Sequence, residues 1–204
     1  MENELLFRFL LLLYYVCIIG INVFYGRRAR QSGRTQTRAD ETAVRREGRG
    51  KFLLRRISGG LMILGVLLYV IYPGWMAALA APLPLWLRWL GVALGLSTLP
   101  LLVWVQQALG RHWSRNLQLQ AEHQLITTGP YARIRHPMYL VIIASFVTVA
   151  LLAANWLVIL PAVGAIAAVY ARIQNEEQML VDAFPEAYPA YMQRTGRLLP
   201  RRPR

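Results

Sequence analysis

Two short segments of the sequence hold residue types that can bind a charged ligand. In the first, Arg135 and His136 stand between a loop that begins with Gly129 and Pro130 and a long apolar run that follows Pro137. Two prolines seven residues apart, with a glycine before the first, favour a turn over a continuous helix. A titratable ring and a permanent cation at the boundary of an apolar run are typical of the rim of a ligand-binding site. The alternative is a basic flank in which the second proline starts a membrane helix.

The second segment follows the apolar run and contains Arg172 and Glu176. A spacing of four residues places both side chains on one face of a helix. The arginine comes first, which is the less favourable order for a stabilising pair, so an ordinary surface ion pair explains this spacing less well. The next residue, Glu177, is expected to face water. Tyr188 and Tyr191 are expected to serve packing in a carboxy-terminal helix.

Composition places both segments in a membrane protein. The chain of 204 residues is 56% hydrophobic and 16% charged, and several apolar runs approach the roughly 20 residues that cross a bilayer. The net charge is +13, but the basic residues lie between the apolar runs, which indicates orientation in a membrane and contact with anionic lipid rather than nucleic-acid binding. One cysteine and three histidines without helical ligand spacing predict neither a disulfide nor a metal site.

We expect an all-α integral membrane protein with about five transmembrane helices. The first three cover residues 5–25, 57–72 (running on to about 80) and 86–105. The apolar run 138–171 would extend about 50 Å as a single helix, against a hydrocarbon core of roughly 30 Å. It must therefore fold back as a helical hairpin, with a turn at Ala153–Trp156.

Every basic segment falls on one side of this topology. The positive-inside rule predicts a cytoplasmic location for residues 26–56, 106–137 and 172–204, and an outside location for the amino terminus and residues 73–85. The first of these segments is expected to form a loop with a short amphipathic helix near residues 41–56. Because the hairpin returns the chain to its starting face, the two ligand-binding segments are expected to meet.

Together the two segments resemble the carboxy-terminal signature of the isoprenylcysteine carboxyl methyltransferase family, which is similar to the phospholipid N-methyltransferases. The resemblance extends over about residues 106–200 and rests on His123-Gln-Leu-Ile-Thr-Thr-Gly-Pro-Tyr131, Arg135-His-Pro-Met-Tyr139 and Arg172-Ile-Gln-Asn-Glu176. It implies a membrane methyltransferase that uses S-adenosyl-L-methionine without a Rossmann domain. It also implies amino-terminal spans in residues 1–105 and a cofactor-binding region in 106–204, with a cytoplasmic pocket built from 106–137 and 172–200.

The resemblance implies a role for individual residues. Arg172 would bind the substrate and act as the catalytic residue. A family glutamine that contacts the cofactor matches either Gln118 or Gln120, with Gln118 as the first candidate. The other implied cofactor-binding residues are His123, Gln124, Leu125, Ile126, Tyr131, His136, Pro137, Met138, Tyr139 and Glu176.

These residue types suit S-adenosyl-L-methionine, which carries a sulfonium, an adenine, an ammonium and a carboxylate. Glu176 can pair with the ammonium, and the faces of Tyr131 or Tyr139 suit the adenine or the sulfonium. A carboxylate acceptor is ionised near neutral pH and needs no general base, only a close and water-free approach to the methyl group. An amine acceptor would have to lose a proton, and Arg172 is a poor neighbour for that step. The residues thus favour a carboxylate acceptor, although a phosphate-bearing lipid could also use Arg172. The resemblance implies carboxyl O-methylation of an isoprenylcysteine-like substrate.

Other functions stay open. The acceptor could instead be a phospholipid amine or a small thiol. A sterol-type membrane reductase would bind a nicotinamide cofactor, and a non-catalytic membrane scaffold would use the Arg-rich segment 26–56. Under the methyltransferase interpretation the partners are the bilayer and a lipophilic or prenylated acceptor. The location is then a bacterial or archaeal inner membrane, and the oligomeric state has no signal in the sequence.

Overall fold

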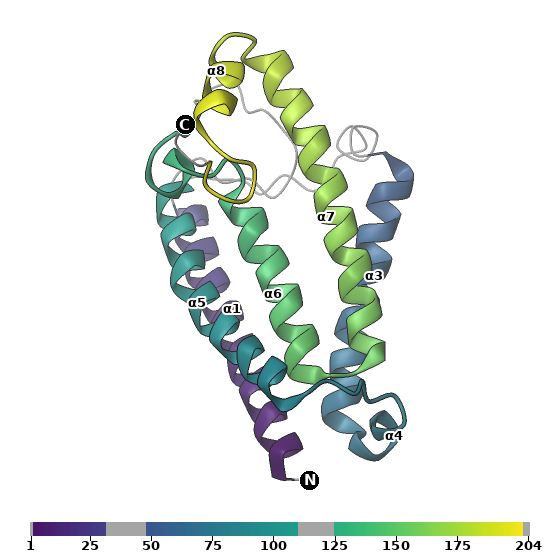
Figure 1. Cartoon of the computed structure of the whole chain (residues 1–204). Coiled ribbons are helices and arrows are strands. Elements are labelled where there is room, and N and C mark those ends of the chain that lie inside the picture. The colour runs from purple at the N-terminus through teal and green to yellow at the C-terminus, as the bar shows by residue number, and fades with distance from the viewer. Residues whose placement is uncertain (1, 32–47, 110–124, 202–204) are drawn as a thin grey trace.

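The computed structural model describes residues 2–31, 48–109 and 125–201. Within these ranges the chain is helical and forms no strand beyond two isolated bridges (Figure 1). The elements are α1 (Glu2–Gln31), α3 (Arg49–Ile71), α4 (Pro73–Ala77), α5 (Leu85–Leu109), the 3-10 helix η2 (Gly129–Ala132), α6 (Pro137–Ala153), α7 (Trp156–Ala183) and α8 (Ala187–Arg194).

Four of the described helices are long and apolar enough to cross a membrane, and α6 is a shorter apolar helix of 17 residues. The four candidate spans are Asn3–Ala29, Gly50–Ile71, Leu85–Leu109 and Trp156–Ala183. Large apolar side chains such as Phe9, Val16 and Leu96 are more than 60% exposed, as expected for surfaces that face lipid. The prediction of an all-α multi-pass membrane protein is confirmed.

The helices pack as a bundle in which α6 is central. It contacts α1 and α5 on one side and α7 on the other, and α3 lies along α7 (Figure 1). Small residues allow these close contacts: a Cβ on Gly65 would lie 2.6 Å from the Leu157 carbonyl oxygen, and one on Gly95 would lie 2.9 Å from Thr148. The core between α1, α3, α6 and α7 is formed by buried residues that include Phe7, Leu11, Met62, Val66, Leu152, Val158 and Ala162.

The turn between α6 and α7 lies at the predicted position. Ala154 has φ of 45° and ends α6 in the left-handed conformation, and Asn155 then caps α7 by accepting a hydrogen bond from the Leu157 amide. The Asn155 side chain also donates to the Met76 carbonyl at 2.8 Å, and the Trp156 amide donates to Leu79. These bonds attach the hairpin turn to α4 and to the segment that follows it.

Several helix boundaries differ from the predictions. Helix α3 ends at Ile71 and does not run on to about residue 80, and α5 continues to Leu109 instead of ending at residue 105. Helix α1 continues to Gln31 instead of ending at residue 25, and α3 begins at Arg49 instead of residue 57. Apolarity marks only the part of a helix that meets lipid, whereas arginine-rich turns outside that zone still have good helix propensity. Of the segment predicted as a loop with an amphipathic helix near residues 41–56, residues 49–56 belong to α3. Residues 32–47 lie outside the described ranges.

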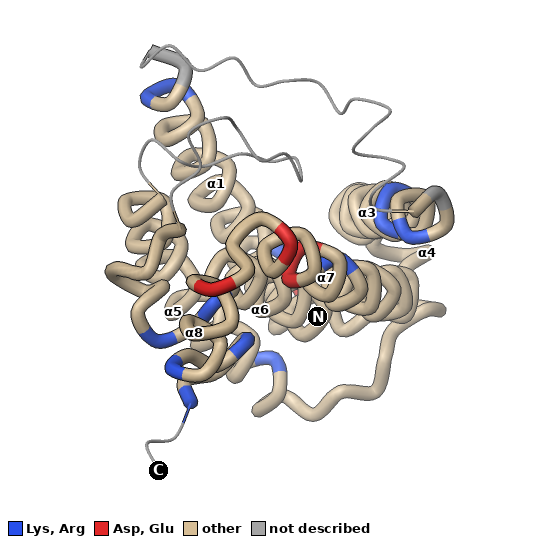
Figure 2. Tube along the Cα trace, turned by 90° about the horizontal axis from the view of Figure 1, so that it is seen from above, with Lys and Arg blue, Asp and Glu red and all other residues tan. Residues whose placement is uncertain are grey.

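Helix α7 positions the candidate site. Its 28 residues extend about 42 Å, which exceeds a hydrocarbon core of roughly 30 Å. Its last turns therefore project beyond the apolar part of the bundle, at the end where α8 folds back towards η2. Figure 2 shows this end from above, with the acidic residues of α7 and of the turn before α8 among basic residues of neighbouring segments.

Candidate functional site

The loop before α6 is shaped by Gly129. This residue has φ of 61°, and a Cβ on it would lie 3.2 Å from the Cβ of Ala108 on α5, so glycine suits both the backbone and the close contact. Pro130 in η2 is buried, and Tyr131 packs against the cluster of Leu102, Val105 and Val141. The sequence-based choice of a turn at this position is thereby confirmed.

This loop is held by the carboxy-terminal tail. The Arg135 amide donates to the Gly196 carbonyl at 2.8 Å, and the His136 amide donates to the Arg197 carbonyl at 3.1 Å. In the reverse direction, the Gly196 amide donates to the Arg133 carbonyl at 3.2 Å. Because these are backbone bonds, they fix the path of the loop independently of its side chains.

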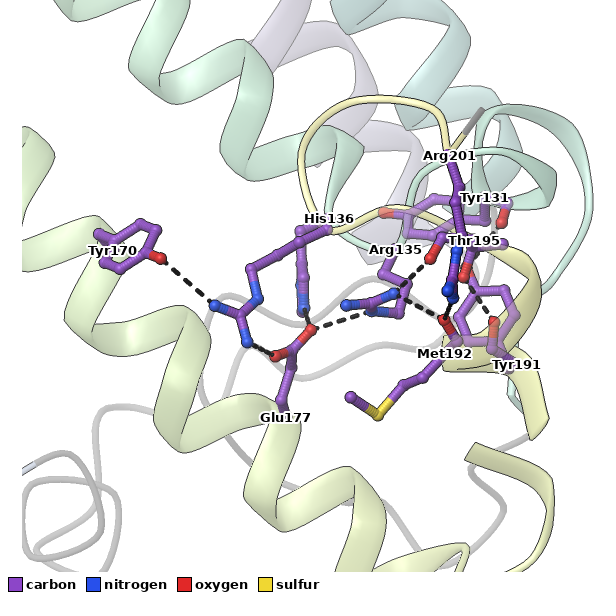
Figure 3. Close-up of polar contacts among 10 residues, drawn as sticks. Tyr131, Arg135, His136, Tyr170, Glu177, Tyr191, Met192, Thr195 and Arg201 are labelled. Atoms are coloured by element: carbon purple, nitrogen blue, oxygen red, sulfur yellow. Dashed lines mark hydrogen bonds and ion pairs between the residues drawn. The ribbon is translucent and has the colours of Figure 1, made fainter. Parts of the chain in front are cut away.

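Glu177 is at the centre of a buried ion-pair cluster that we call the Glu177 cluster, formed with Arg135, His136 and Arg197. Its Oε1 accepts from Arg135 Nε at 2.9 Å and lies 3.3 Å from His136 Nε2, and its Oε2 accepts from Arg197 Nη2 at 2.5 Å (Figure 3). Glu177 is 5% exposed and His136 is 4% exposed. The expectation that Glu177 faces water is therefore wrong.

The sequence of α7 contains a pattern that indicates burial of Glu177. Val169, Ile173 and Glu177 recur every four residues along α7 and lie on one face, and all three are buried. The burial of a carboxylate requires charged partners, and these come from the loop before α6 and from the tail. Such partners, far away in the sequence, could not be identified from periodicity.

Tyr139, at the start of α6, forms a second polar group with α7. Its hydroxyl donates to Glu176 Oε2 at 2.5 Å and accepts from Arg172 Nε at 2.9 Å. The ring centroids of Tyr139 and His136 are 5.6 Å apart, so this group adjoins the Glu177 cluster. The structure thus brings together Arg172, Glu176, Tyr139 and His136, as the two-segment hypothesis expects.

The remaining predicted residues divide into two sets. Pro137 is buried in the first turn of α6, Met138 packs against the Leu102 cluster, and Leu125 and Ile126 are partly buried before η2. These four apolar side chains can line a pocket but carry no charge or hydrogen-bonding group of their own apart from the weakly accepting Met138 sulfur. Gln118, Gln120, His123 and Gln124 lie outside the described ranges.

Helix α8 completes the arrangement. Tyr191 donates its hydroxyl hydrogen to the Tyr131 carbonyl at 2.6 Å, and Arg135 donates to the Met192 and Thr195 carbonyls at 3.2 and 2.5 Å (Figure 3). Both predicted packing tyrosines, Tyr188 and Tyr191, are buried. Tyr191 also bonds the loop, which goes beyond packing. Burial raises the pKa of Tyr191 to about 12 and raises that of Tyr131 further, so both phenols stay protonated at neutral pH.

In chemical terms, the site offers a carboxylate, a guanidinium and aromatic faces at the end of the bundle. Glu176 can bind a cation and Arg172 can bind an anion, and both are half-buried next to Tyr139. Among the described residues, no three His, Cys, Asp or Glu side chains gather in an arrangement that could hold a metal ion.

Comparison with known proteins gives one result for this region. The model of the isoprenylcysteine carboxyl methyltransferase family matches residues 90–182, from within α5 to the penultimate residue of α7. No curated protein matches the chain significantly. The match includes η2, the hairpin, Tyr139, Arg172 and Glu176, and it confirms the resemblance seen in the two motif segments. The part of this multi-pass membrane protein that is similar to the isoprenylcysteine carboxyl methyltransferase family is therefore residues 90–182.

Proposed function

We propose that the chain is an S-adenosyl-L-methionine-dependent methyltransferase that acts on a lipophilic acceptor. Carboxyl O-methylation of an isoprenylcysteine-like substrate is the reaction that the site supports best. The observation that carries this proposal is the Tyr139 hydroxyl held between Arg172 and Glu176. This arrangement places a guanidinium and a carboxylate of α7 side by side near the start of α6.

The residues present fit the cofactor. Among the described residues Glu176 receives one hydrogen bond, on Oε2, so its other oxygen can accept from an ammonium group. The rings of Tyr131 and Tyr139 offer faces for a sulfonium or an adenine. When bound, S-adenosyl-L-methionine supplies an activated methyl group on its sulfonium.

The chain's own residues bind and orient the acceptor. Arg172 provides a fixed cation that can hold a carboxylate through two hydrogen bonds. Its Nε is oriented by Tyr139, which Glu176 orients in turn. An acceptor that is already ionised needs no base, so the work of the site is to hold it in line and to exclude water. A lipophilic acceptor would reach this position from the bilayer.

We infer a cytoplasmic location for this end of the bundle, in a bacterial or archaeal inner membrane, from the basic segments around it.

Calorimetric binding of S-adenosylhomocysteine to the purified protein tests the cofactor. We expect binding by the wild type and a loss of at least about tenfold in affinity for Glu176→Ala and for His136→Ala, because each removes a polar group of the site. Glu186→Ala is the matched control, since Glu186 is an exposed carboxylate at the start of α8. Absence of binding by the wild type, or displacement by NADPH as in a membrane reductase, would overturn the proposal.

A labelling experiment tests the acceptor. Membrane fractions are incubated with the protein and S-adenosyl-L-methionine that carries a radioactive methyl group. Base-labile label on a prenylated species is expected for a methyl ester. Base-stable label would identify a phospholipid amine or a thiol as the acceptor and reject O-methylation.

Deletion of residues 32–47 should leave cofactor binding intact, whereas a scaffold that uses this segment would lose its function.

A further inference from the structure

A second charged group lies at the end of the bundle where α1 begins, remote from α8 (Figure 1). We call it the Arg88 cluster and define it by Arg88, Glu4, Tyr69 and Arg8. Arg88, in the first turn of α5, is buried and donates to Glu4 of α1 and to the Tyr69 hydroxyl of α3 at 3.2 Å. Tyr69 donates in turn to Glu4 at 2.9 Å. The Arg88 cluster therefore joins α1, α3 and α5, and it lies outside residues 90–182.

The Arg88 cluster has an excess of positive charge. Both oxygens of Glu4 accept from Arg88, so one guanidinium already matches the charge of this carboxylate. The guanidinium of Arg8 lies over the Tyr69 ring, 4.9 Å from its centroid. Arg8 makes no hydrogen bond or ion pair with a described residue. Two arginines and one carboxylate thus leave one net positive charge, which belongs to Arg8.

The guanidinium of Arg8 is accessible from the surface of the protein. The residue is half-buried, and its Nε is a buried atom without a partner, whereas its two terminal nitrogens are not sealed in this way. The side chain of Glu4, one helical turn before Arg8, is 44% exposed. A ligand at the membrane surface can therefore reach the terminal nitrogens without displacing packed side chains.

Aromatic residues mark the level of the Arg88 cluster in the membrane. Trp86 and Trp89 lie in the same two turns of α5 as Arg88, and both are exposed. Tyr72, which follows α3, and Trp75 in α4 are also exposed. Trp and Tyr are enriched where the hydrocarbon core meets the lipid headgroups. The Arg88 cluster consequently lies at the level of the lipid phosphates.

The chemistry of Arg8 favours a phosphate that carries a net negative charge. A guanidinium can bind a phosphate group through two parallel hydrogen bonds. Leu5 and Phe9 are exposed in the same turns of α1, and a cation beside such apolar surface is costly unless it is paired. Because Arg88 already matches the charge of Glu4, no carboxylate is left to bind the ammonium of a zwitterionic headgroup.

We propose that Arg8 binds the phosphate group of an anionic phospholipid, on a platform formed by the ring of Tyr69 and the Glu4–Arg88 pair. The site is independent of the proposed methyl transfer, since it lies at the opposite end of the bundle. Arg27 and Arg28 lie at the far end of the same helix, so they face the other membrane surface and do not contribute to this site.

Native mass spectrometry of the full-length protein in detergent tests the site. The protein is mixed with equal amounts of phosphatidylglycerol and phosphatidylcholine, and the bound lipids are counted. We expect the wild type to prefer phosphatidylglycerol and Arg8→Gln to bind it about tenfold more weakly. Arg27→Gln is the matched control, because it removes an exposed arginine from the same helix and changes the net charge equally. Its affinity should fall by less than about threefold.

Arg8→Lys keeps a positive charge over the Tyr69 ring and so covers the case in which Arg8→Gln does not fold. It should bind phosphatidylglycerol more weakly than the wild type, because lysine lacks the two-pronged geometry of the guanidinium. Wild-type affinity in Arg8→Lys or in Arg8→Gln would overturn the proposal. Equal losses in Arg8→Gln and Arg27→Gln would also overturn it, since net charge alone would then attract the lipid. Displacement of the lipid by an equal concentration of inorganic phosphate would assign the site to free phosphate instead.

Discussion

Among the described residues, Glu177 is the only acidic side chain that is buried, and it joins three separate parts of the chain. It receives Arg135 and His136 from the loop before α6 and Arg197 from the tail, while its own backbone belongs to α7. A buried ion pair adds little net stability over a well-packed apolar contact. Loss of one member is costly nevertheless, because the remaining charge stays buried without compensation. The Glu177 cluster therefore acts mainly by requiring one arrangement of loop, tail and helix.

Replacement of Glu177 by glutamine should be strongly destabilising. Arg135 has a side chain that is 9% exposed and would keep its charge without a carboxylate. We expect a loss of about 3 kcal/mol in the free energy of unfolding, measured by denaturant titration in detergent. Glu186→Gln, which changes an exposed carboxylate in the same way, should leave stability within about 0.5 kcal/mol. Equal stability of the two variants would show that the Glu177 cluster does not constrain the fold.

Alkaline pH should weaken the contribution of Tyr191. Burial raises its pKa from the usual 10.0 to about 12, so the unfolded chain loses this proton at a lower pH than the folded protein does. The stabilisation is complete below pH 10 and falls as the pH rises through 12. Thermal unfolding of wild type and Tyr191→Phe should differ most near pH 9, and the difference should shrink towards pH 12. A difference that is constant over this range would contradict the assignment.

At the scale of elements, α3 is held against α7 by small residues. A Cβ on Gly65 would lie 2.6 Å from the Leu157 carbonyl oxygen, and one on Gly164 would lie 2.7 Å from the Ser58 hydroxyl. The first obstacle is backbone and cannot move aside, whereas the second is the end of a side chain. Helix α3 lies mainly against α7, and Tyr69 adds hydrogen bonds to Glu4 of α1 and Arg88 of α5, so the close approach at these glycines determines much of its attachment to the bundle.

Gly65→Ala should therefore push α3 away from α7. We expect a loss of about 1–3 kcal/mol in unfolding free energy, in the range found for overpacked cores. Gly60→Ala on the same helix is the control, because a Cβ at that position would have no atom within 4 Å. That variant should be neutral or more stable by up to about 1 kcal/mol, since alanine is the better helix former. A neutral result for Gly65→Ala would mean that the two helices are not in close contact in the membrane.

At the scale of the whole molecule, the sequence predicted what depends on local pattern. Apolar length predicted the spans and the hairpin turn at Ala153–Trp156, and the hairpin in turn predicted that Arg172 and Glu176 return to the neighbourhood of Tyr139. Helix ends were predicted less well because the apolar run ends before the helix does. The inward position of Glu177 depends on Arg197 of the tail, and the tail pairs with the loop through contacts that no local pattern encodes.

The tail should be required for ligand binding even where it carries no side chain of the site. A Cβ on Gly196 would lie 1.7 Å from the Leu199 carbonyl oxygen, so Gly196→Ala must open the tail turn. Release of the turn breaks the backbone bonds to Arg133 and Arg135 and removes Arg197 from Glu177. We expect at least about tenfold weaker binding of S-adenosylhomocysteine by calorimetry. Gly74→Ala, with no neighbouring atom within 4 Å, should bind normally, and equal affinity of both variants would reject this dependence.

The hydrogen bonds that Asn155 and Trp156 donate to the carbonyls of Met76 and Leu79 limit how α6 and α7 can move relative to each other. These bonds hold the turn between α6 and α7 in place, at the end of the two helices that is remote from Tyr139, Arg172 and Glu176. A change in the angle between the two helices would therefore pivot about this turn. Over the roughly 25 Å length of α6, a change of about 5° in the angle between α6 and α7 would move the two helices apart by about 2 Å at the level of Tyr139. That movement would break the Tyr139 contacts, and the Glu177 cluster, which joins the same ends of the two helices, opposes it.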